Sequence, residues 1–334
     1  MNNTRRKIKK SKSKGKNSKS RRMSKKTSKR SIKKSYMVPR KSSLSDDIIP
    51  EEKFVEQSPT GRYLRFREIL GQGSSKTVYK AIDTSLMREI AWNTIDVKNK
   101  TKDEKRRIVE EIELLNNMNN PYIMKFYGSW AVKDSENKIF KINFMTEMSS
   151  SGSLKEFLYK YRFFKIEHIK NWCTQILEAL NYLHSQGIIH RDLKCENIFI
   201  HGDTSQIFIG DFGLSTRKEL GKSAVGTPEY MAPELYESNP YNDKIDMYAF
   251  GMCMLEMCTL EPPYNECTSI PQIYRKVTSG ILPESLDRVK DENMRQMISK
   301  LLSSDPNNRP SAAQLLSSNF FKKIDERKIP DEKL

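Results

Sequence analysis

The stretch HRDLKCEN at residues 190–197 decides the fold, because three further motifs stand around it in a fixed order. A glycine-rich run, GQGSSKTV, precedes it at residues 71–78. DFG follows at residues 211–213, and GTPEYMAPE follows at residues 226–234. One glycine-rich run would be weak support for any fold, whereas four motifs in this order and at these intervals are not a chance occurrence.

The four motifs resemble the signature set of the protein kinases. The resemblance implies an α+β, bilobal fold with a small β-rich N-lobe and a larger helical C-lobe. Periodicity agrees for the N-lobe, with strand-like runs at 63–70, 77–82, 89–97, 124–130 and 138–146 and a helical run at 102–118. After a short hinge at 147–152, helical patterns predominate, at 165–185, 243–259, 293–302 and 312–316.

The net charge of +17 is concentrated at the N-terminus. Residues 1–45 hold 19 Lys and Arg and no Asp or Glu, so the rest of the chain carries a net charge of −2. Such a tail has too few apolar residues to offset the entropy of ordering it. We therefore expect a disordered basic tail at 1–45, a linker at 46–61, a kinase catalytic domain at 62–321 and a polar C-terminal tail at 322–334.

The basic tail lacks the apolar run of a secretory signal, and we expect no membrane span, because no apolar run is long enough to cross a bilayer. Its five cysteines are scattered and form no CxxC pair, which favours reduced thiols in a cytoplasmic compartment. Nuclear localisation through the basic tail is an alternative. The tail is also a candidate for contact with nucleic acid or acidic surfaces, and base stacking is not expected, because Tyr36 is its one aromatic residue.

Phosphoryl transfer depends on positioning and charge neutralisation, and each requirement has a candidate residue. We expect Asp211 and Asn197 to hold Mg²⁺. Asp192 is the candidate for orienting the substrate hydroxyl and accepting its proton, and Lys194 for meeting the γ-phosphate of ATP. A catalytically silent relative would usually have lost the residue equivalent to Asp192, Asn197 or Asp211, and this chain keeps all three.

The lysine that normally clamps the ATP phosphates is missing. IAWN at residues 90–93 stands where kinases carry VAIK, so Asn93 takes the lysine position. In the glycine-rich run, Gly71 and Gly73 let the backbone approach the phosphates, but Lys76 replaces the third glycine. Side chains alternate along a strand, so Lys76 shares a face with Val78, which covers the adenine in the kinase pattern. We therefore expect Lys76 to supply the missing cation.

This arrangement resembles the With-No-Lysine (WNK) kinases, whose catalytic lysine comes from the glycine loop. The resemblance extends over about 62–321, and it is carried by SKTVYK at 75–80, IAW at 90–92, FYGSW at 126–130, NWC at 171–173, LKCENIFI at 193–200 and YAFGMCMLEM at 248–257. The family usually has leucine where this chain has Phe212. That leucine helps to form an inhibitory chloride site in the family, and the larger Phe212 changes its wall.

The resemblance implies roles for further residues. Glu111 should pair with Lys76, with Glu113 as the rival candidate. Ser223 matches the activating phosphoserine, and a phosphate on it could be met by Arg191.

Other residues are implied to bind ATP. Thr146 looks like the gatekeeper, the residue at the back wall of the ATP site. The backbones of Glu147 and Ser149 should meet the adenine. We also expect Ala91 and Val78 among the ATP-binding residues.

The prediction is an active serine/threonine protein kinase of WNK-like type that uses ATP and Mg²⁺ and acts on protein substrates. Thr227 before Pro228 favours serine/threonine rather than tyrosine kinases. Self-association would allow phosphorylation in trans. Two alternatives of other classes remain, a catalytically silent pseudokinase scaffold and a protein whose basic tail tethers it to nucleic acid or acidic surfaces.

Overall fold

The computed structural model describes residues 54–73, 76–212, 216–217, 226–237 and 240–321. The predicted basic tail at 1–45, the first half of the predicted linker (46–53) and the C-terminal tail at 322–334 lie outside these residues.

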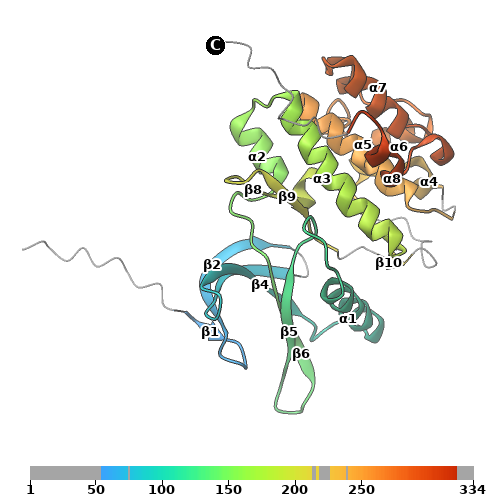
Figure 1. The fold of residues 1–334 in the computed structure, drawn as a ribbon. Coiled ribbons are helices and arrows are strands. Elements are labelled where there is room, and N and C mark those ends of the chain that lie inside the picture. Colours follow the sequence, from blue (N-terminus) through green and yellow to red (C-terminus); the bar gives the residue numbers. More distant parts are fainter. Residues whose placement is uncertain (1–53, 74–75, 213–215, 218–225, 238–239, 322–334) are drawn as a thin grey trace, which may run out of the picture. The chain divides into compact units, whose positions relative to one another are not determined.

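A six-stranded antiparallel sheet forms the N-lobe, with the strand order β1-β2-β3-β4-β6-β5 (Figure 1). Its strands are β1 (Glu56–Gln57), β2 (Tyr63–Gln72), β3 (Lys76–Asp83), β4 (Arg88–Asp96), β5 (Phe126–Lys133) and β6 (Ile139–Thr146). Five of these correspond to predicted strands. The strand β1 lies in the segment predicted as linker, and it pairs with Leu64 and Arg65 of β2.

The two faces of the sheet are distinct because side chains alternate along each strand. One face packs Trp92 and Met145, both fully buried, into a small cluster with Tyr63, Ala81 and Ile90. The other face contributes Ile95 and Phe144 to the main hydrophobic core, together with Leu115 of the helix α1 (Lys102–Asn116). Residues of β4 that face this core therefore also face the C-lobe.

The C-lobe is helical (Figure 1). Its helices are α2 (Leu154–Tyr161), α3 (Ile166–Ser185), α4 (Pro233–Tyr236), α5 (Lys244–Thr259), α6 (Ile270–Thr278), α7 (Glu292–Leu301) and α8 (Ala312–Ser317). Short strands accompany them: β7 (Ile188–Ile189), β8 (Ile198–His201), β9 (Gln206–Ile209) and β10 (Thr216–Arg217). The 3₁₀ turns are η1 (Cys195–Asn197), η3 (Pro228–Tyr230), η4 (Glu284–Arg288) and η5 (Pro306–Asn308).

Helix α5 is the centre of this lobe, as its apolar composition predicts. Every residue from Ile245 to Met257 is buried, so the helix has neighbours on all sides. Gly251 permits the close packing of α7 against it, because a Cβ at this position would lie 2.8 Å from the Leu301 Cβ. The predicted bilobal architecture, with a β-rich N-lobe and a helical C-lobe, is therefore confirmed. No helix in the described part of the chain combines the length and apolar character needed to cross a bilayer.

Candidate active site

A cleft of about 920 Å³ lies between the C-lobe and the face of the sheet that carries Ala91 and Phe144. It brings together all the residues that the sequence assigns to nucleotide and metal binding, namely Gly71, Gly73, Lys76, Val78, Ala91, Glu111, Thr146, Glu147, Ser149, Asn197 and Asp211. A Cβ built on Gly71 would meet no protein atom within 4 Å, so this glycine leaves space open for a ligand. The size of the cleft and its glycine-lined edge fit a nucleotide.

Lys76 is the first residue of β3, and its ammonium points into the cleft. Its Nζ donates to Asp211 Oδ1 at 3.3 Å. Burial acts to raise the pKa of the Asp211 carboxyl, but the Lys76 ammonium outweighs it, so the pKa is lowered. Val78 and Lys80 also line the cleft, as alternation along β3 predicts. The glycine-loop lysine therefore faces the carboxylate that is assigned to the metal.

Glu111 does not make the expected ion pair. It lies on α1 and lines the cleft, but among the described residues the ion pair of Lys76 within 4.0 Å is with Asp211. The rival Glu113 has no such contact with Lys76 either. Burial raises the pKa of the Glu111 carboxyl, with Lys76 acting in the opposite direction. The Lys76 ammonium therefore pairs with Asp211 rather than with Glu111.

Asn93 fills the usual lysine position without any charged partner. Its side chain is buried, and its Nδ2 donates to Thr146 Oγ1 at 3.0 Å. The position that carries the lysine in most kinases is thus occupied by a buried, uncharged side chain.

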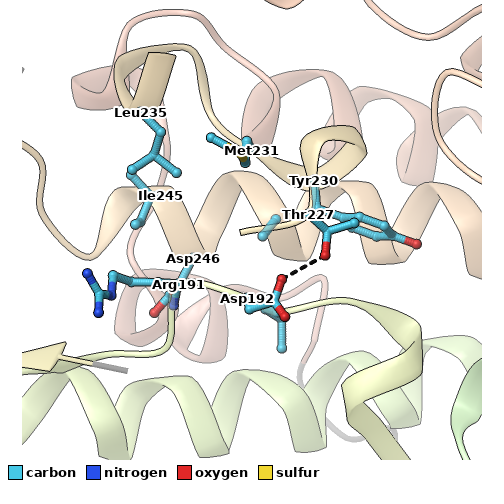
Figure 2. Close-up of a pocket in the computed structure, with 10 residues that line it drawn as sticks. Arg191, Asp192, Thr227, Tyr230, Met231, Leu235, Ile245 and Asp246 are labelled. Atoms are coloured by element: carbon cyan, nitrogen blue, oxygen red, sulfur yellow. Dashed lines mark hydrogen bonds between the residues drawn. The ribbon is translucent and has the colours of Figure 1, made fainter. Parts of the chain in front are cut away.

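The catalytic loop contains a compact set of hydrogen bonds around Asp192. Thr227 donates its hydroxyl to Asp192 Oδ1 at 2.8 Å, and Figure 2 shows the two side chains pointing toward each other. Lys194 Nζ lies 2.7 Å from Thr227 Oγ1 and 3.2 Å from Asp192 Oδ2. The base candidate and the cation candidate are therefore adjacent before any ligand binds. From the sequence, Thr227 was expected only to mark the serine/threonine class, and its contact with Asp192 was not predicted.

Asn197 is oriented by Asp192. Its Nδ2 donates to Asp192 O at 2.8 Å and to Asp192 Oδ2 at 3.0 Å, which turns its Oδ1 the other way. Among the described residues, no three His, Cys, Asp or Glu side chains gather into a metal site. A cation here would be held by Asn197, Asp211 and ligand oxygens, a donor set that suits Mg²⁺.

The backbone of the catalytic loop is held by Asp246 of α5. Its carboxylate accepts from the backbone N–H groups of His190 and Arg191, each at 2.9 Å. Arg191 needs such support, since its φ of +69° is unusual for a residue other than glycine. His184 Nε2 lies 2.9 Å from the same carboxylate. Burial acts to raise the pKa of Asp246, but His184 and the other donors outweigh it and lower the pKa.

The hinge is fixed to both lobes. The Glu147 N–H donates to Lys125 O at 2.9 Å, so the group that its backbone can offer to a base is the carbonyl. The Ser149 hydroxyl lies 2.6 Å from Ile200 O and 2.9 Å from Gly152 O, which anchors the hinge to β8.

The predicted phosphorylation site and its predicted partner are Ser223 and Arg191. Ser223 lies outside the described residues. Arg191, the expected partner of a phosphate on Ser223, donates from Nη1 to the Tyr241 hydroxyl at 3.1 Å.

Comparison with known proteins gives a consistent result. The model of the family described as "Protein kinase domain" matches residues 64–321. Serine/threonine-protein kinase WNK8 of Arabidopsis thaliana is 47% identical over 277 residues, which is 81% of this chain and 48% of that protein. Probable serine/threonine-protein kinase WNK10 of Arabidopsis thaliana is also 47% identical, over 81% of this chain and 52% of its own length.

A mammalian relative aligns over the same share of the chain. Serine/threonine-protein kinase WNK3 of Mus musculus is 46% identical over 275 residues, which is 81% of this chain but only 16% of that protein. The chain thus spans about half the length of the plant relatives and much less of the mouse one.

Proposed function

Because the chain belongs to the protein kinase family and its catalytic domain is of the WNK type, we propose that it is an active serine/threonine kinase in which Lys76 neutralises the ATP phosphates. One observation carries this proposal, the 3.3 Å contact of Lys76 Nζ with Asp211 Oδ1 across the cleft. A silent scaffold is not favoured, since Asp192, Asn197 and Asp211 are all retained and Asp192 and Asn197 are hydrogen-bonded to each other.

Each residue of the site has a defined task in the proposed reaction. Asp192 orients the acceptor hydroxyl and takes its proton, while Thr227 keeps the Asp192 carboxylate in position. Lys194 and Lys76 place positive charge where negative charge develops during phosphoryl transfer. A bound Mg²⁺ would neutralise phosphate charge, held by Asn197 and Asp211.

Lys76→Met tests the proposal. Loss of a preorganised cation should lower kcat/KM for ATP by about 100- to 1,000-fold, as for other transition-state charge stabilisers. Lys80→Met is the matched control on the same strand, because Lys80 Nζ pairs with Glu89 at 2.8 Å. Asn93→Ala should leave kcat nearly unchanged, since it removes no charge. Near-normal turnover in Lys76→Met, with a severe loss in Lys80→Met, would transfer the role to Lys80.

We further propose that phosphorylation of Ser223 in trans activates the chain, with Arg191 as one partner of the phosphate. Phosphatase-treated protein should then show a lag in activity that shortens as protein concentration rises. Full initial activity of Ser223→Ala, without a lag, would contradict this.

A further inference from the structure

Asn93 lines the cleft at the position where the kinase motif has a lysine. The motif gives no role to an asparagine there. Its side chain lies on the same face of β4 as Ala91, toward the cleft, and only 4% of the residue is exposed. A buried amide is costly unless its hydrogen bonds are made. The partners of this amide therefore indicate what it does.

The acceptors around Asn93 Nδ2 all come from β4 and β6. They are Thr146 Oγ1 at 3.0 Å, Phe144 O at 3.4 Å and Ala91 O at 3.4 Å. Reversing the amide would set its oxygen against two carbonyl oxygens, so the surroundings determine its orientation. Thr146 lies opposite Ala91 in the strand register, which makes it the diagonal neighbour of Asn93. The shortest of the three bonds is therefore a cross-strand bond to the gatekeeper.

We propose that Asn93 is a specificity-determining residue, which holds Thr146 in one rotamer and thereby limits the size of the substituent that a bound purine can carry. This inference rests on the ATP binding proposed above. Thr146 directly precedes the hinge residue Glu147, lines the cleft and is 2% exposed. Its χ1 has three staggered wells, and the bond to Asn93 selects the one that turns Oγ1 toward β4. Within the described residues the Thr146 hydroxyl has no other hydrogen bond, so no second polar contact fixes it.

The consequence is that the back wall of the ATP site is held in place by the hydrogen bond between Asn93 and Thr146 and not by a large side chain. In most kinases a lysine side chain passes through this position, and here a shorter amide takes its place. Without the amide, Thr146 would lose its anchor and gain space behind it. A bulky group on the purine could then displace the Thr146 side chain toward β4.

The experiment compares ATP with N6-benzyl-ATP as phosphoryl donor. The measured quantity is the kcat/KM for N6-benzyl-ATP divided by that for ATP. Asn93→Ala should raise this ratio about 3- to 10-fold, the range expected for one net hydrogen bond. Thr146→Val, which keeps the volume but removes the hydroxyl, should raise it similarly. Adding Asn93→Ala to Thr146→Val should change it little, because the bond is already absent.

Thr94→Val is the matched control. It breaks another cross-strand bond between the same two strands, from Thr94 Oγ1 to Asn143 Oδ1 at 2.9 Å, on the opposite face of the sheet. The proposal predicts an unchanged ratio in this variant. An unchanged ratio in both Asn93→Ala and Thr146→Val, or an equal rise in Thr94→Val, would overturn it.

The same comparison distinguishes this inference from the proposed function. If the unsubstituted chain phosphorylates no acceptor, the shift in Tm caused by each nucleotide replaces kcat/KM. A larger gain for N6-benzyl-ATP in Asn93→Ala than in the unsubstituted chain would still support the role of Asn93. Equal gains in the two proteins would contradict it.

Discussion

Glu111 is a carboxyl in a place where its charge is costly. Burial raises its pKa, the nearby Asp211 adds to the rise, and only Lys76 acts to lower it. Lys76 is engaged with Asp211. In the structure Glu111 therefore destabilises the fold when it ionises, which suits a residue kept for function rather than for stability.

The first prediction concerns Glu111→Gln and its dependence on pH. The pKa of Glu in an unfolded chain is about 4.3, and the folded value is higher, so the folded state binds more protons between the two values. Stability from this group is therefore fully present below about pH 4.3 and is lost as pH rises through the folded pKa. Glu111→Gln should raise Tm at pH 7 and leave it nearly unchanged at pH 4.

Activity supplies the complementary measurement for Glu111. If Glu111 pairs with Lys76 in the ATP-bound state, as the resemblance implies, Glu111→Gln should lower kcat/KM while Tm rises. Glu113→Gln, two residues along α1, is the control, because Glu113 does not line the cleft. A fall in Tm at pH 7 for Glu111→Gln would show that the ionised Glu111 carboxylate stabilises the fold, and would contradict the prediction.

At the scale of residues, the direction of Lys76 followed from sequence, because alternation along a strand assigns faces without knowledge of the fold. The partner of Lys76 did not follow, since Glu111 and Asp211 both line the cleft and only the tertiary structure decides which one lies within reach of the ammonium. The bond between Asn93 and Thr146 was equally hidden. It depends on the register of β4 against β6, which a sequence pattern leaves undetermined.

Helix α1 carries Glu111 into the cleft but has little of its own surface buried. Leu115 is its one buried residue, so hydrophobic packing stabilises this helix only weakly. A capping box compensates at its N-terminus. The Thr101 side chain accepts from the Glu104 N–H at 3.2 Å, and Glu104 Oε2 accepts from the Thr101 N–H at 2.7 Å. The position of Glu111 thus depends on a local motif ten residues away in sequence.

The second prediction is that Thr101→Ala frays α1 at a cost of about 1 kcal/mol. Amide hydrogen exchange should speed up at the start of α1, and kcat/KM should fall because Glu111 is less well placed. Ser311→Ala is the matched control, since Ser311 forms the same kind of capping box with Gln314 on α8, away from the cleft. It should lose similar stability without losing activity. An equal loss of activity in both variants would count against a specific role of α1.

The long helices were predictable, and the short elements were predicted only in part. The helices α3 and α5 have enough turns for their apolar patterns to be read. Helices α2, α4 and α6 were not predicted, although the six-residue helix α8 was. The strand β1 is defined by its pairing with β2 and has no pattern of its own. Local periodicity thus predicted the framework of each lobe but not the segments that tertiary contacts impose.

A largely buried ion pair between Arg309 and Glu234 connects separate segments of the C-lobe. Arg309 has no exposed side-chain surface, and it binds Glu234 through Nη1 at 2.6 Å and Nη2 at 2.8 Å. Its other donors reach the carbonyls of Ser303, Ser304 and Lys244. All five guanidinium hydrogens therefore have an acceptor. The pair connects the segment before α8 to α4 and to the start of α5.

The third prediction follows for the stability of the whole lobe. Arg309→Met leaves the Glu234 carboxylate buried without a partner, so the free energy of unfolding should fall by about 3–5 kcal/mol. Arg295→Met is the control, because Arg295 pairs with Glu292 on the exposed face of α7. Its loss should be about 1 kcal/mol or less. Urea unfolding followed by fluorescence measures both, and equal losses would contradict the reading.

Asp246 links the catalytic loop to the centre of the C-lobe, and this has a consequence for how the protein loses activity on heating. The N–H groups of His190 and Arg191 are bonded to a side chain of α5, the most deeply buried helix described. The loop cannot rearrange while α5 stays folded without giving up those bonds. Thermal loss of the proposed kinase activity should therefore have the same half-life as global unfolding of the C-lobe, which is set by the unfolding barrier of its core.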